Sequence, residues 1–411
     1  MKTKFDFFKN VKDETILSMG IENRTIKCTG YDLLIDPDLG SWAVIEEDSK
    51  LCNELRKGVP LSSLKEKFDE NILSRKLNDL FFSGLINLNG KNALEKKCTS
   101  KTHEIAPKYI VVKYTKACNL KCSYCYSYHK GISKFNIPQD FILKTLRLIS
   151  ESYGNDDITF VLHGGEPLLR FKEIKNLIEN SKRINDNVEF TIQTNATLIT
   201  KDIAYFLNKN NVSVGVSVDG YNNSSNLLRR FNNNKDSLSK TLSGINNLQN
   251  AGTNVGLISV VTNQNYKELI NYIRFFVEKD INDFNFLPYF PAGRGSKKEN
   301  KFAVNYNDLV KVNTDILLYI NDYNTNKPKE KRIHERQLRQ LIRHLTQWGK
   351  SYMCAESPCG AGRRILGLDI DGGLYPCDDL IGNKNFLIGN VDNISNVKEV
   401  LKNSDVMTKS L

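Results

Sequence analysis

Three cysteines, Cys118, Cys122 and Cys125, lie close together in the sequence with the spacing C-x3-C-x2-C. They follow an apolar run at residues 109–114 that is typical of a β-strand, so we expect them on a loop. Iron–sulfur clusters normally take four thiolates, and a triplet would leave one iron of a 4Fe–4S cluster open to a small chelating molecule. A structural zinc site is the alternative, but its cysteines usually come as two close pairs. The spacing therefore favours an iron–sulfur cluster.

The triplet, with Tyr124 before its last cysteine, resembles the cluster loop of the radical S-adenosylmethionine (SAM) superfamily. This resemblance implies that the amino and carboxylate groups of SAM chelate the open iron. It also implies that an electron from the cluster cleaves SAM to a 5′-deoxyadenosyl radical, which abstracts a substrate hydrogen. In such enzymes the protein supplies position and shielding. The expected electron donor is a flavodoxin- or ferredoxin-type protein.

Six strand-like runs alternate with helical patterns from residue 107 onward, which predicts six βα units and a parallel sheet. The runs are residues 109–114, 158–163, 188–194, 212–218, 255–262 and 284–288. The expected fold class is therefore α/β. The resemblance implies a partial (β/α)6 TIM-like barrel, in which functional residues lie at the carboxyl ends of the strands.

Gly164, Gly165 and Glu166 follow the second of these strands. Paired glycines let a backbone approach a ligand closely, and a carboxylate can accept hydrogen bonds from an ammonium group. An ordinary turn is the alternative. The stretch resembles the GGE motif of the radical SAM family, which contacts the SAM amino group. The neighbouring His163 is expected to pack beside the cluster or to have a structural role.

Asn195 follows the third strand, and Ser217 ends the fourth. Their amide and hydroxyl groups suit a ribose or a carboxylate, and the family has equivalents of both near SAM. Asp219 is either part of this site or only a turn residue. Arg229 or Arg230 is expected to bind the SAM carboxylate, because arginine suits bidentate carboxylate recognition. The pattern does not distinguish these two arginines.

Cys354, Cys359 and Cys377 form a second group of cysteines near the C-terminal end of the sequence. Residues 371–373 predict a hairpin turn that returns a strand carrying Cys377 toward the other two. The arrangement resembles the opening half of a SPASM domain, in the shortened "twitch" form with one auxiliary iron–sulfur cluster. This resemblance implies an auxiliary 4Fe–4S cluster; a zinc site or unconnected thiols are the alternatives.

Asp378 follows Cys377 directly, at a position where related sulfatase-maturing enzymes have an aspartate base. A carboxylate there could take a proton from a substrate group, although a solvated turn is the alternative. Three cysteines leave the second cluster one ligand short. The fourth ligand could be Cys98, Asp378, water or a substrate thiolate.

The first hundred residues have a different pattern, in which three strand-like runs precede three helical patterns and a last short strand. This order predicts a winged-helix-like α+β domain. It resembles the RiPP recognition element, which binds leader peptides of ribosomally made, post-translationally modified peptides by adding them to a sheet edge. A DNA-binding wing is the alternative, but the expected middle helix lacks the Arg and Asn cluster that suits base reading.

The chain has 411 residues, a length that is compatible with several domains, and its formal net charge is +11. It contains no apolar run long enough to span a membrane and no secretion signal, so we expect a cytoplasmic protein without a membrane partner. Nucleic acid is not the expected partner either. The expected parts are residues 1–97 for leader binding, 98–106 as a linker, 107–300 as the barrel, 301–350 as a helical connector and 351–411 for the auxiliary cluster.

The sequence therefore predicts a radical SAM enzyme that modifies a precursor peptide bound through its leader. An intramolecular thioether is the favoured product, because this layout resembles that of sactipeptide-forming enzymes. Carbon–carbon or ether cross-linking and epimerisation are alternatives with the same core. Formylglycine-type sulfatase maturation is a further alternative. The alternative of a different class is a redox-sensing DNA-binding regulator, which would not need the SAM motifs.

Overall fold

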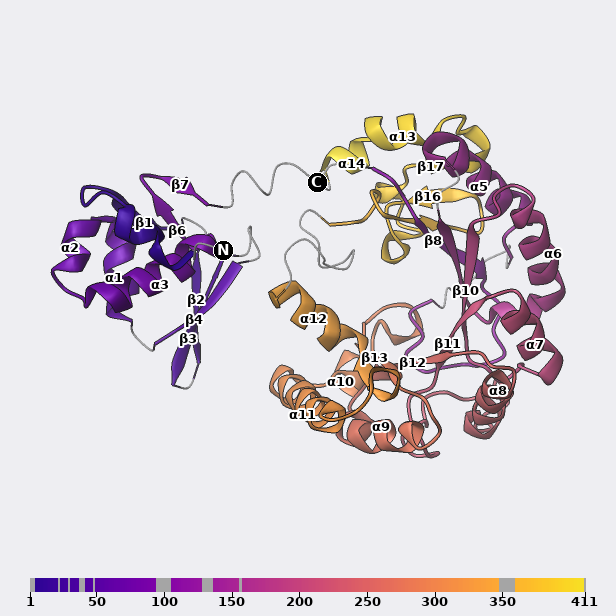
Figure 1. Cartoon of the computed structure of the whole chain (residues 1–411). Coiled ribbons are helices and arrows are strands. Elements are labelled where there is room, and N and C mark those ends of the chain that lie inside the picture. Colours follow the sequence, from indigo (N-terminus) through magenta and orange to yellow (C-terminus); the bar gives the residue numbers. More distant parts are fainter. Residues whose placement is uncertain are drawn as a thin grey trace. The chain divides into compact units, whose positions relative to one another are not determined.

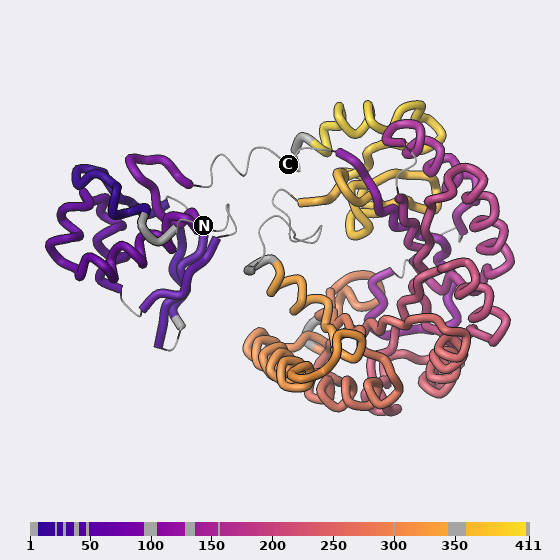
Figure 2. Tube along the Cα trace, viewed as in Figure 1, coloured from indigo at the N-terminus to yellow at the C-terminus, as the bar shows by residue number. Residues whose placement is uncertain are grey.

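The computed structural model divides into two compact units. One comprises Met1–Glu104 with Ile342–Cys359, and the other comprises Ile105–Leu341 with Gly360–Leu411. Figure 1 labels the helices and strands, and Figure 2 traces the chain in the same view. The described residues are 4–20, 23–28, 30–36, 41–46, 49–93, 105–127, 136–154, 157–346 and 359–409.

Within its described residues up to 93, the first unit contains two antiparallel sheets, three α-helices and the 3-10 helix Lys4–Asn10. One sheet has the order β2-β3-β4, and the other has the order β5-β1-β6-β7. The strands of the first sheet are β2 (Arg24–Cys28), β3 (Tyr31–Asp36) and β4 (Ser41–Ile45); those of the second are β1 (Ile16–Met19), β5 (Val59–Pro60), β6 (Ile86–Leu88) and β7 (Lys91–Asn92). The expected strands and helices of this region are present, whereas β1, β5 and β7 were not expected.

The helices of the first unit are α1 (Lys50–Lys57), α2 (Leu61–Lys65) and α3 (Glu70–Phe82). Helix α3 begins after Asp69, whose side chain accepts hydrogen bonds from the backbone amides of Asn71 and Ile72. Leu73, Leu77 and Leu80 recur at helical spacing and are buried in the core of this unit. The apolar periodicity of the sequence therefore sets which face of α3 packs inward.

The second unit is built on a sheet of ten strands in the order β14-β13-β12-β11-β10-β9-β8-β15-β16-β17. Its central strands are parallel and follow chain order: β8 (Tyr109–Thr115), β9 (Ile158–Gly164), β10 (Val188–Thr194), β11 (Ser213–Ser217), β12 (Val255–Val261) and β13 (Asp283–Pro288). The helices between them are α5 (Gln139–Tyr153), α6 (Phe171–Lys182), α7 (Lys201–Lys209), α8 (Leu238–Asn250) and α9 (Leu269–Val277). The six predicted βα units are confirmed.

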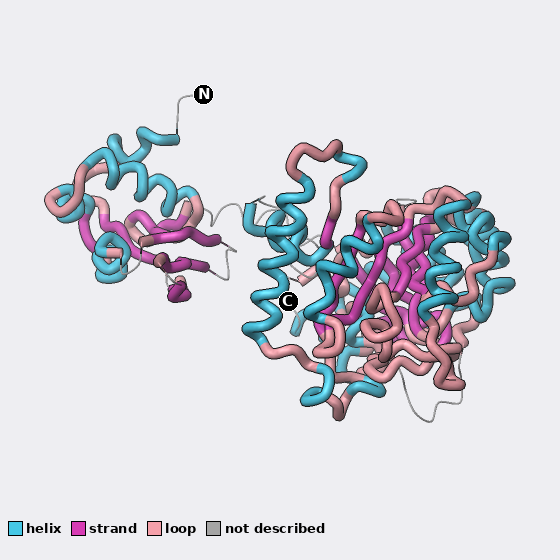
Figure 3. Tube along the Cα trace, turned by 90° about the horizontal axis from the view of Figure 1, so that it is seen from below, coloured by secondary structure: helices cyan, strands magenta, loops and turns pink. Residues whose placement is uncertain are grey.

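The two faces of this sheet differ in polarity. Alternate residues such as Ile110, Phe160 and Ile192 are buried in the main hydrophobic core, where they pack with residues of the surrounding helices. Figures 1 and 3 show these helices along the outer side of the strands. The intervening residues, among them Lys113 and His163, are less buried and include many polar side chains. The inner face is therefore the face on which polar chemistry can occur.

The sequence after residue 300 adds strands to both edges of the sheet. After α10 (Glu299–Phe302) and α11 (Tyr306–Asn324), strand β14 (His334–Glu335) pairs in parallel with β13 and leads into α12 (Arg336–Thr346). The region expected to be only a helical connector therefore contributes a strand. Glu335 accepts hydrogen bonds from the amides of Phe286 and Leu338, at 2.9 Å and 2.7 Å, which ties β14 to both neighbours.

Strand β15 (Ile365–Leu368) pairs in parallel with β8 and antiparallel with β16 (Gly373–Tyr375). The predicted hairpin turn lies between β15 and β16, and Gly372 adopts a φ of 85° there. Strand β17 (Gly389–Asn390), α13 (Val397–Asn403) and α14 (Asp405–Lys409) complete the unit. No helix among the described residues is both long and apolar enough to cross a membrane.

Candidate functional site

The loop that carries Cys118, Cys122 and Cys125 follows β8 and is anchored by backbone hydrogen bonds. The amide of Lys121 donates to the carbonyl of Arg230 at 2.8 Å, and the amide of Ser123 donates to that of Leu228 at 3.0 Å. These contacts join the loop to the segment that follows β11. The conformation of the cysteine loop is therefore fixed by contacts with the segment after the fourth strand, β11, as well as by its connection to the first, β8.

Arg294 anchors the other side of the same loop. Its guanidinium Nη1 donates to the carbonyl of Cys122, and its backbone amide donates to the carbonyl of Cys125, both at 2.8 Å. Arg294 lies in the segment that follows β13. The sequence analysis did not include Arg294 among the candidate site residues. Its contacts add a role in holding the cluster loop.

The three thiols form a donor set that fits a metal cluster. The three thiols are partly buried. Burial is the main cause that raises the pKa of Cys118 to about 11 and of Cys122 to about 12, and the charges of neighbouring thiolates contribute to both values. A bound cation is what would keep such thiols deprotonated. Within the described ranges, no three His, Cys, Asp or Glu side chains converge on a single metal ion. The spacing of the three cysteines in the sequence favours a 4Fe–4S cluster, in which each cysteine binds a different iron, over one zinc ion.

Gly164 and Gly165 press the end of β9 against this loop. The amide of Gly165 donates to the carbonyl of Thr115 at 2.6 Å, and the amide of Glu166 donates to that of Ala117 at 2.8 Å. A Cβ atom on either glycine would overlap a backbone carbonyl, of Thr115 or of Ala117. Glycine is therefore required at both positions for this close approach.

Glu166 is fully buried and holds neighbouring strand ends together. Its carboxylate accepts hydrogen bonds from the Thr194 hydroxyl at 2.7 Å and from the amides of Asn195 and Leu168 at 2.8 Å and 3.1 Å. Burial raises the pKa of this carboxyl group, and the hydrogen bonds oppose the rise. The geometry gives Glu166 an organising role, and its expected contact with SAM stays a prediction.

Asn195 and Ser217 lie at the ends of β10 and β11, as predicted. The Asn195 amide group donates to the side chain of Asn119 in the cluster loop at 2.9 Å and accepts from the amide and hydroxyl of Thr197. The Ser217 hydroxyl accepts a hydrogen bond from Gln193 at 2.8 Å. Since the Ser217 hydroxyl is also a donor, it can still bind a ligand acceptor.

Tyr124, Asp219 and Arg229 form a buried hydrogen-bonded network behind the cluster loop. The Tyr124 hydroxyl donates to the Asp219 carboxylate and accepts from Arg229 at 2.8 Å. Arg229 is only 8% exposed, whereas the Arg230 guanidinium binds carbonyls of its own loop. Of the two arginines, Arg229 is the one that enters the site. Asp219 is thus more than a turn residue.

Lys113 and Tyr126 belong to a polar cluster that the sequence analysis missed. Lys113 of β8 is the register partner of His163 on β9. His163 Nε2 lies 2.9 Å from the Tyr126 hydroxyl, and His163 Nδ1 accepts from the amide of Gly164. This leaves the proton of the neutral ring on Nε2, which donates to Tyr126. Only the alternation of β8 and the position of Tyr126 beside Cys125 could have indicated these residues.

Asp378 and Asp379 face this polar cluster from the segment after β16. Burial, followed by the charges of these two carboxylates, raises the pKa of Tyr126. Burial, with the charge of Lys113 as a smaller cause, lowers the pKa of His163 to about 4. Burial also raises the pKa of Asp378. The candidate base therefore lies near residues of β8, of β9 and of the segment after Cys125.

The structure does not test the predicted ligand set of the second cluster. Cys354 and the alternative ligand Cys98 lie outside the described residues. Cys359 and Cys377 belong to different compact units. Cys377 is partly buried, and burial raises the pKa of its thiol to about 11. The ligand set of the second cluster therefore stays a prediction.

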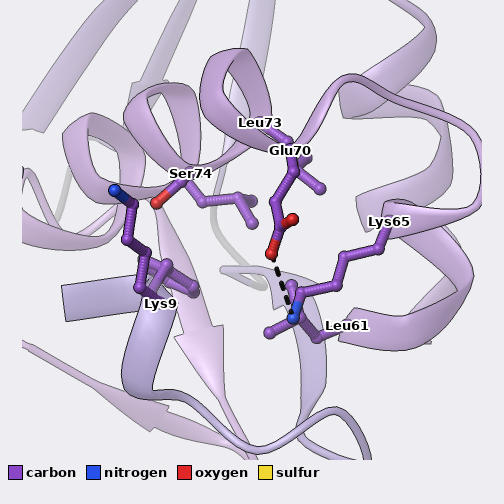
Figure 4. A pocket seen from close by; sticks show the side chains of 8 residues that line it. Lys9, Leu61, Lys65, Glu70, Leu73 and Ser74 are labelled. Atoms are coloured by element: carbon purple, nitrogen blue, oxygen red, sulfur yellow. Dashed lines mark ion pairs between the residues drawn. The ribbon is translucent and has the colours of Figure 1, made fainter. Parts of the chain in front are cut away.

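The first unit contains a small, open pocket between its N-terminal segment, α2 and α3. Phe8, Leu61, Leu73 and Leu77 give it an apolar lining. Figure 4 shows the 3.6 Å ion pair between Lys65 and Glu70 at this pocket, together with the side chains of Lys9 and Ser74. Within the described part of the chain, the buried hydroxyl of Ser74 has no hydrogen-bond partner.

Sequence comparison agrees with the class of protein that this barrel and cysteine loop define. Residues 112–276 match the model of the Radical SAM superfamily. This part of the barrel is therefore similar to radical SAM domains, whose cofactors are the predicted 4Fe–4S cluster and SAM.

Two relatives show how far the similarity extends. An uncharacterised protein of Methanocaldococcus jannaschii is 34% identical over 183 residues, which are 44% of this chain and 62% of that protein. A cysteine-type anaerobic sulfatase-maturating enzyme of Clostridium novyi is 26% identical over 270 residues, covering 64% of this chain and 70% of the enzyme. The chain thus spans less than two thirds of the first relative.

Two solved structures have the same fold. The enzyme anSMEcpe with bound AdoMet and the Kp18Cys peptide matches with a TM-score of 0.64 and 22% identity, over 74% of this chain and 83% of that one. SuiB of Streptococcus suis bound to the precursor peptide SuiA matches with a TM-score of 0.55 and 16% identity, over 95% and 90%. At these identities the likeness concerns the fold alone.

Proposed function

We propose that this protein is a radical SAM maturase that modifies a ribosomally made precursor peptide. In this proposal Cys118, Cys122 and Cys125 bind the SAM cluster, and Ser217 and Arg229 are the foremost candidates for contacts with SAM. When bound, the SAM cluster supplies the electron that generates the 5′-deoxyadenosyl radical. The fold neighbours, one with a bound peptide and one with a bound precursor peptide, support a peptide substrate.

The observation that carries the proposal is the polar cluster on the inner face of the barrel. It lies next to Cys125 through Tyr126 and next to Cys377 through Asp378. A radical generated at the first cysteine loop would therefore arise near a partly buried carboxylate. A carboxylate in such a position is suited to accept a proton from a substrate group.

A thioether is the product that we favour. Joining a thiol to a carbon removes a proton from the sulfur and a hydrogen atom from the carbon, and it leaves one electron to be accepted. The radical takes the hydrogen atom, Asp378 takes the proton, and an auxiliary cluster at Cys354, Cys359 and Cys377 is the proposed electron acceptor. Carbon–carbon or ether cross-links and epimerisation remain alternatives that the same site could support.

The leader of the peptide would bind to the first unit. The outer strands of its three-stranded sheet are β2 and β4, so an added peptide strand must pair with one of them. Val44 on β4 is 58% exposed, and Ile26 on β2 is 47% exposed, so both edges present apolar side chains.

The test uses the reconstituted full chain with SAM, dithionite and the peptide encoded by the neighbouring short open reading frame. We expect 5′-deoxyadenosine and a peptide that is about two mass units lighter. Cys118→Ser should abolish both, whereas Cys52→Ser, which changes a buried thiol of α1, should abolish neither. If the wild-type protein forms no 5′-deoxyadenosine, the proposed enzyme activity is wrong.

A second candidate function is formylglycine-type sulfatase maturation. It is favoured by the 26% identity with the Clostridium novyi enzyme over most of that enzyme's length. The same assay separates the two candidates when a peptide with a sulfatase-type cysteine is supplied. Formation of an aldehyde that reacts with a hydrazide probe would support sulfatase maturation, and a cross-linked peptide without aldehyde would support the first proposal.

A further inference from the structure

Lys113 is a charged residue at the centre of the polar cluster. It is flanked on one side by His163, its register partner on β9. On the other side Val112 is the partner of Leu368 on β15, so the next residue, Asp369, follows at the level of Lys113. Asp369 is 7% exposed, and its charge acts on Lys113. Lys113 is thus a partly buried cation between two neighbouring strands.

The segment after Cys377 is held by two contacts to this part of the sheet. Gly367 of β15 packs so closely against the carbonyl of Cys377 that a Cβ atom would lie only 2.6 Å from it. Further along, the Lys113 ammonium group donates to the carbonyl of Ile381 at 3.5 Å. Between these two anchors lies a single 3-10 turn, Asp378–Leu380. Lys113 therefore holds the far end of the turn that carries the candidate base.

Charge gives the same assignment independently. Asp378 and Asp379 are adjacent carboxylates, and each destabilises a negative charge on the other when both are partly buried. The Lys113 ammonium group, hydrogen-bonded to the carbonyl of Ile381, brings a positive charge to the same short segment. Loss of the Lys113 ammonium group would therefore leave the two carboxylates without their shared cation.

We propose that Lys113 is a positioning residue that holds the turn Asp378–Leu380 against the inner face of β8, so that the Asp378 carboxylate faces the cluster loop near Tyr126. This inference rests on the proposed function, in which Asp378 accepts a substrate proton. Lys113 acts through Asp378. It should therefore matter for product formation at bound substrate, and little for cluster assembly or SAM cleavage.

The test compares Lys113→Met, which removes the charge at similar length, with Lys113→Arg, which keeps it. We expect Lys113→Met to lower kcat for the modified peptide roughly 100-fold, since a misplacement of about 1 Å can cost this much. The KM for the peptide and the iron content should change little, and 5′-deoxyadenosine should still form without matching product. Lys113→Arg should recover most of the kcat. Lys240→Met, an exposed lysine on α8, is the matched control.

A second measurement does not depend on activity. Hydrogen–deuterium exchange of the reconstituted protein should become faster in residues 378–382 of Lys113→Met and of Lys113→Gln, but not of Lys240→Met. Unchanged exchange in this segment, or wild-type kcat in Lys113→Met, would overturn the inference. So would loss of iron in both charge-removing variants. If the wild-type enzyme forms no product, the proposed function fails, and the exchange result still decides the role of Lys113.

Discussion

Arg229 and Arg230 are neighbours in the sequence, but the structure gives them different surroundings. The Arg229 side chain is buried against Tyr124 and near Asp219, whereas the Arg230 guanidinium donates to the carbonyls of Leu227 and Asn234. The side-chain type is the same at both positions, so no residue pattern could choose between them. The turn that follows β11 decides which arginine points inward.

We expect Arg229→Met to destabilise the protein by about 3–5 kcal/mol, because it leaves the buried Asp219 carboxylate without its cation. Arg230→Met should change the free energy of unfolding by less than about 0.5 kcal/mol, as exposed substitutions usually do. Urea unfolding of the two variants measures this difference. Similar losses in both variants would contradict the assignment of Arg229 to the site.

At the same scale, the residue types of the site were predictable, but several roles were not. Cys118, Cys122 and Cys125 could be found from their spacing alone. Glu166 was expected to face a ligand, yet its carboxylate is occupied by three protein donors. Lys113 belongs to no sequence motif. The role of a lysine in a strand depends on the residues of neighbouring strands, which the local sequence does not show.

The close approach of β9 to the cluster loop is a property of whole elements. The loop backbone runs so near the end of β9 that no residue larger than glycine fits at the positions of Gly164 and Gly165. The sequence analysis assigned the paired glycines to ligand approach. The structure shows that the nearest neighbour is the protein's own backbone.

We expect Gly165→Ala to displace the cluster loop and to lower the iron content and the melting temperature of the reconstituted protein. A methyl group there would overlap the carbonyl of Ala117, which is backbone and cannot move aside alone. In Gly256→Ala the new methyl would meet mainly the tip of the flexible Arg336 side chain, at 2.9 Å. This control should keep its iron. Normal iron content in Gly165→Ala would show that the loop can adapt.

The alternating strands and helices made the six central strands predictable, because each has a strong local pattern. Strand β14 was not predicted, and neither was the pairing of β15 with β8, for a physical reason. Strands β14 and β15 are each short, and each is stabilised by pairing with a distant strand, as in the pairing of Ile365 with Tyr109. Local periodicity carries no information about such partners.

At the scale of the whole molecule, the number of iron–sulfur clusters in the chain can be measured directly. Two 4Fe–4S clusters would give roughly eight irons per chain. We expect Cys377→Ser to keep about four irons and to form 5′-deoxyadenosine without modified peptide. Iron analysis and chromatographic detection of the nucleoside check this. A wild-type protein with about four irons would contradict the auxiliary cluster.

The pairing of β15 with β8 has a consequence for how the protein is made. Strand β8 lies between β9 and β15, and β15 is encoded about 250 residues later. While the chain is still being synthesised, β8 therefore has one open edge and lacks its second neighbour. The strand that leads into the cysteine loop becomes complete only when the last part of the chain has emerged from the ribosome. Stable cluster insertion is accordingly expected after synthesis, and a chain truncated before residue 365 should be purified without iron.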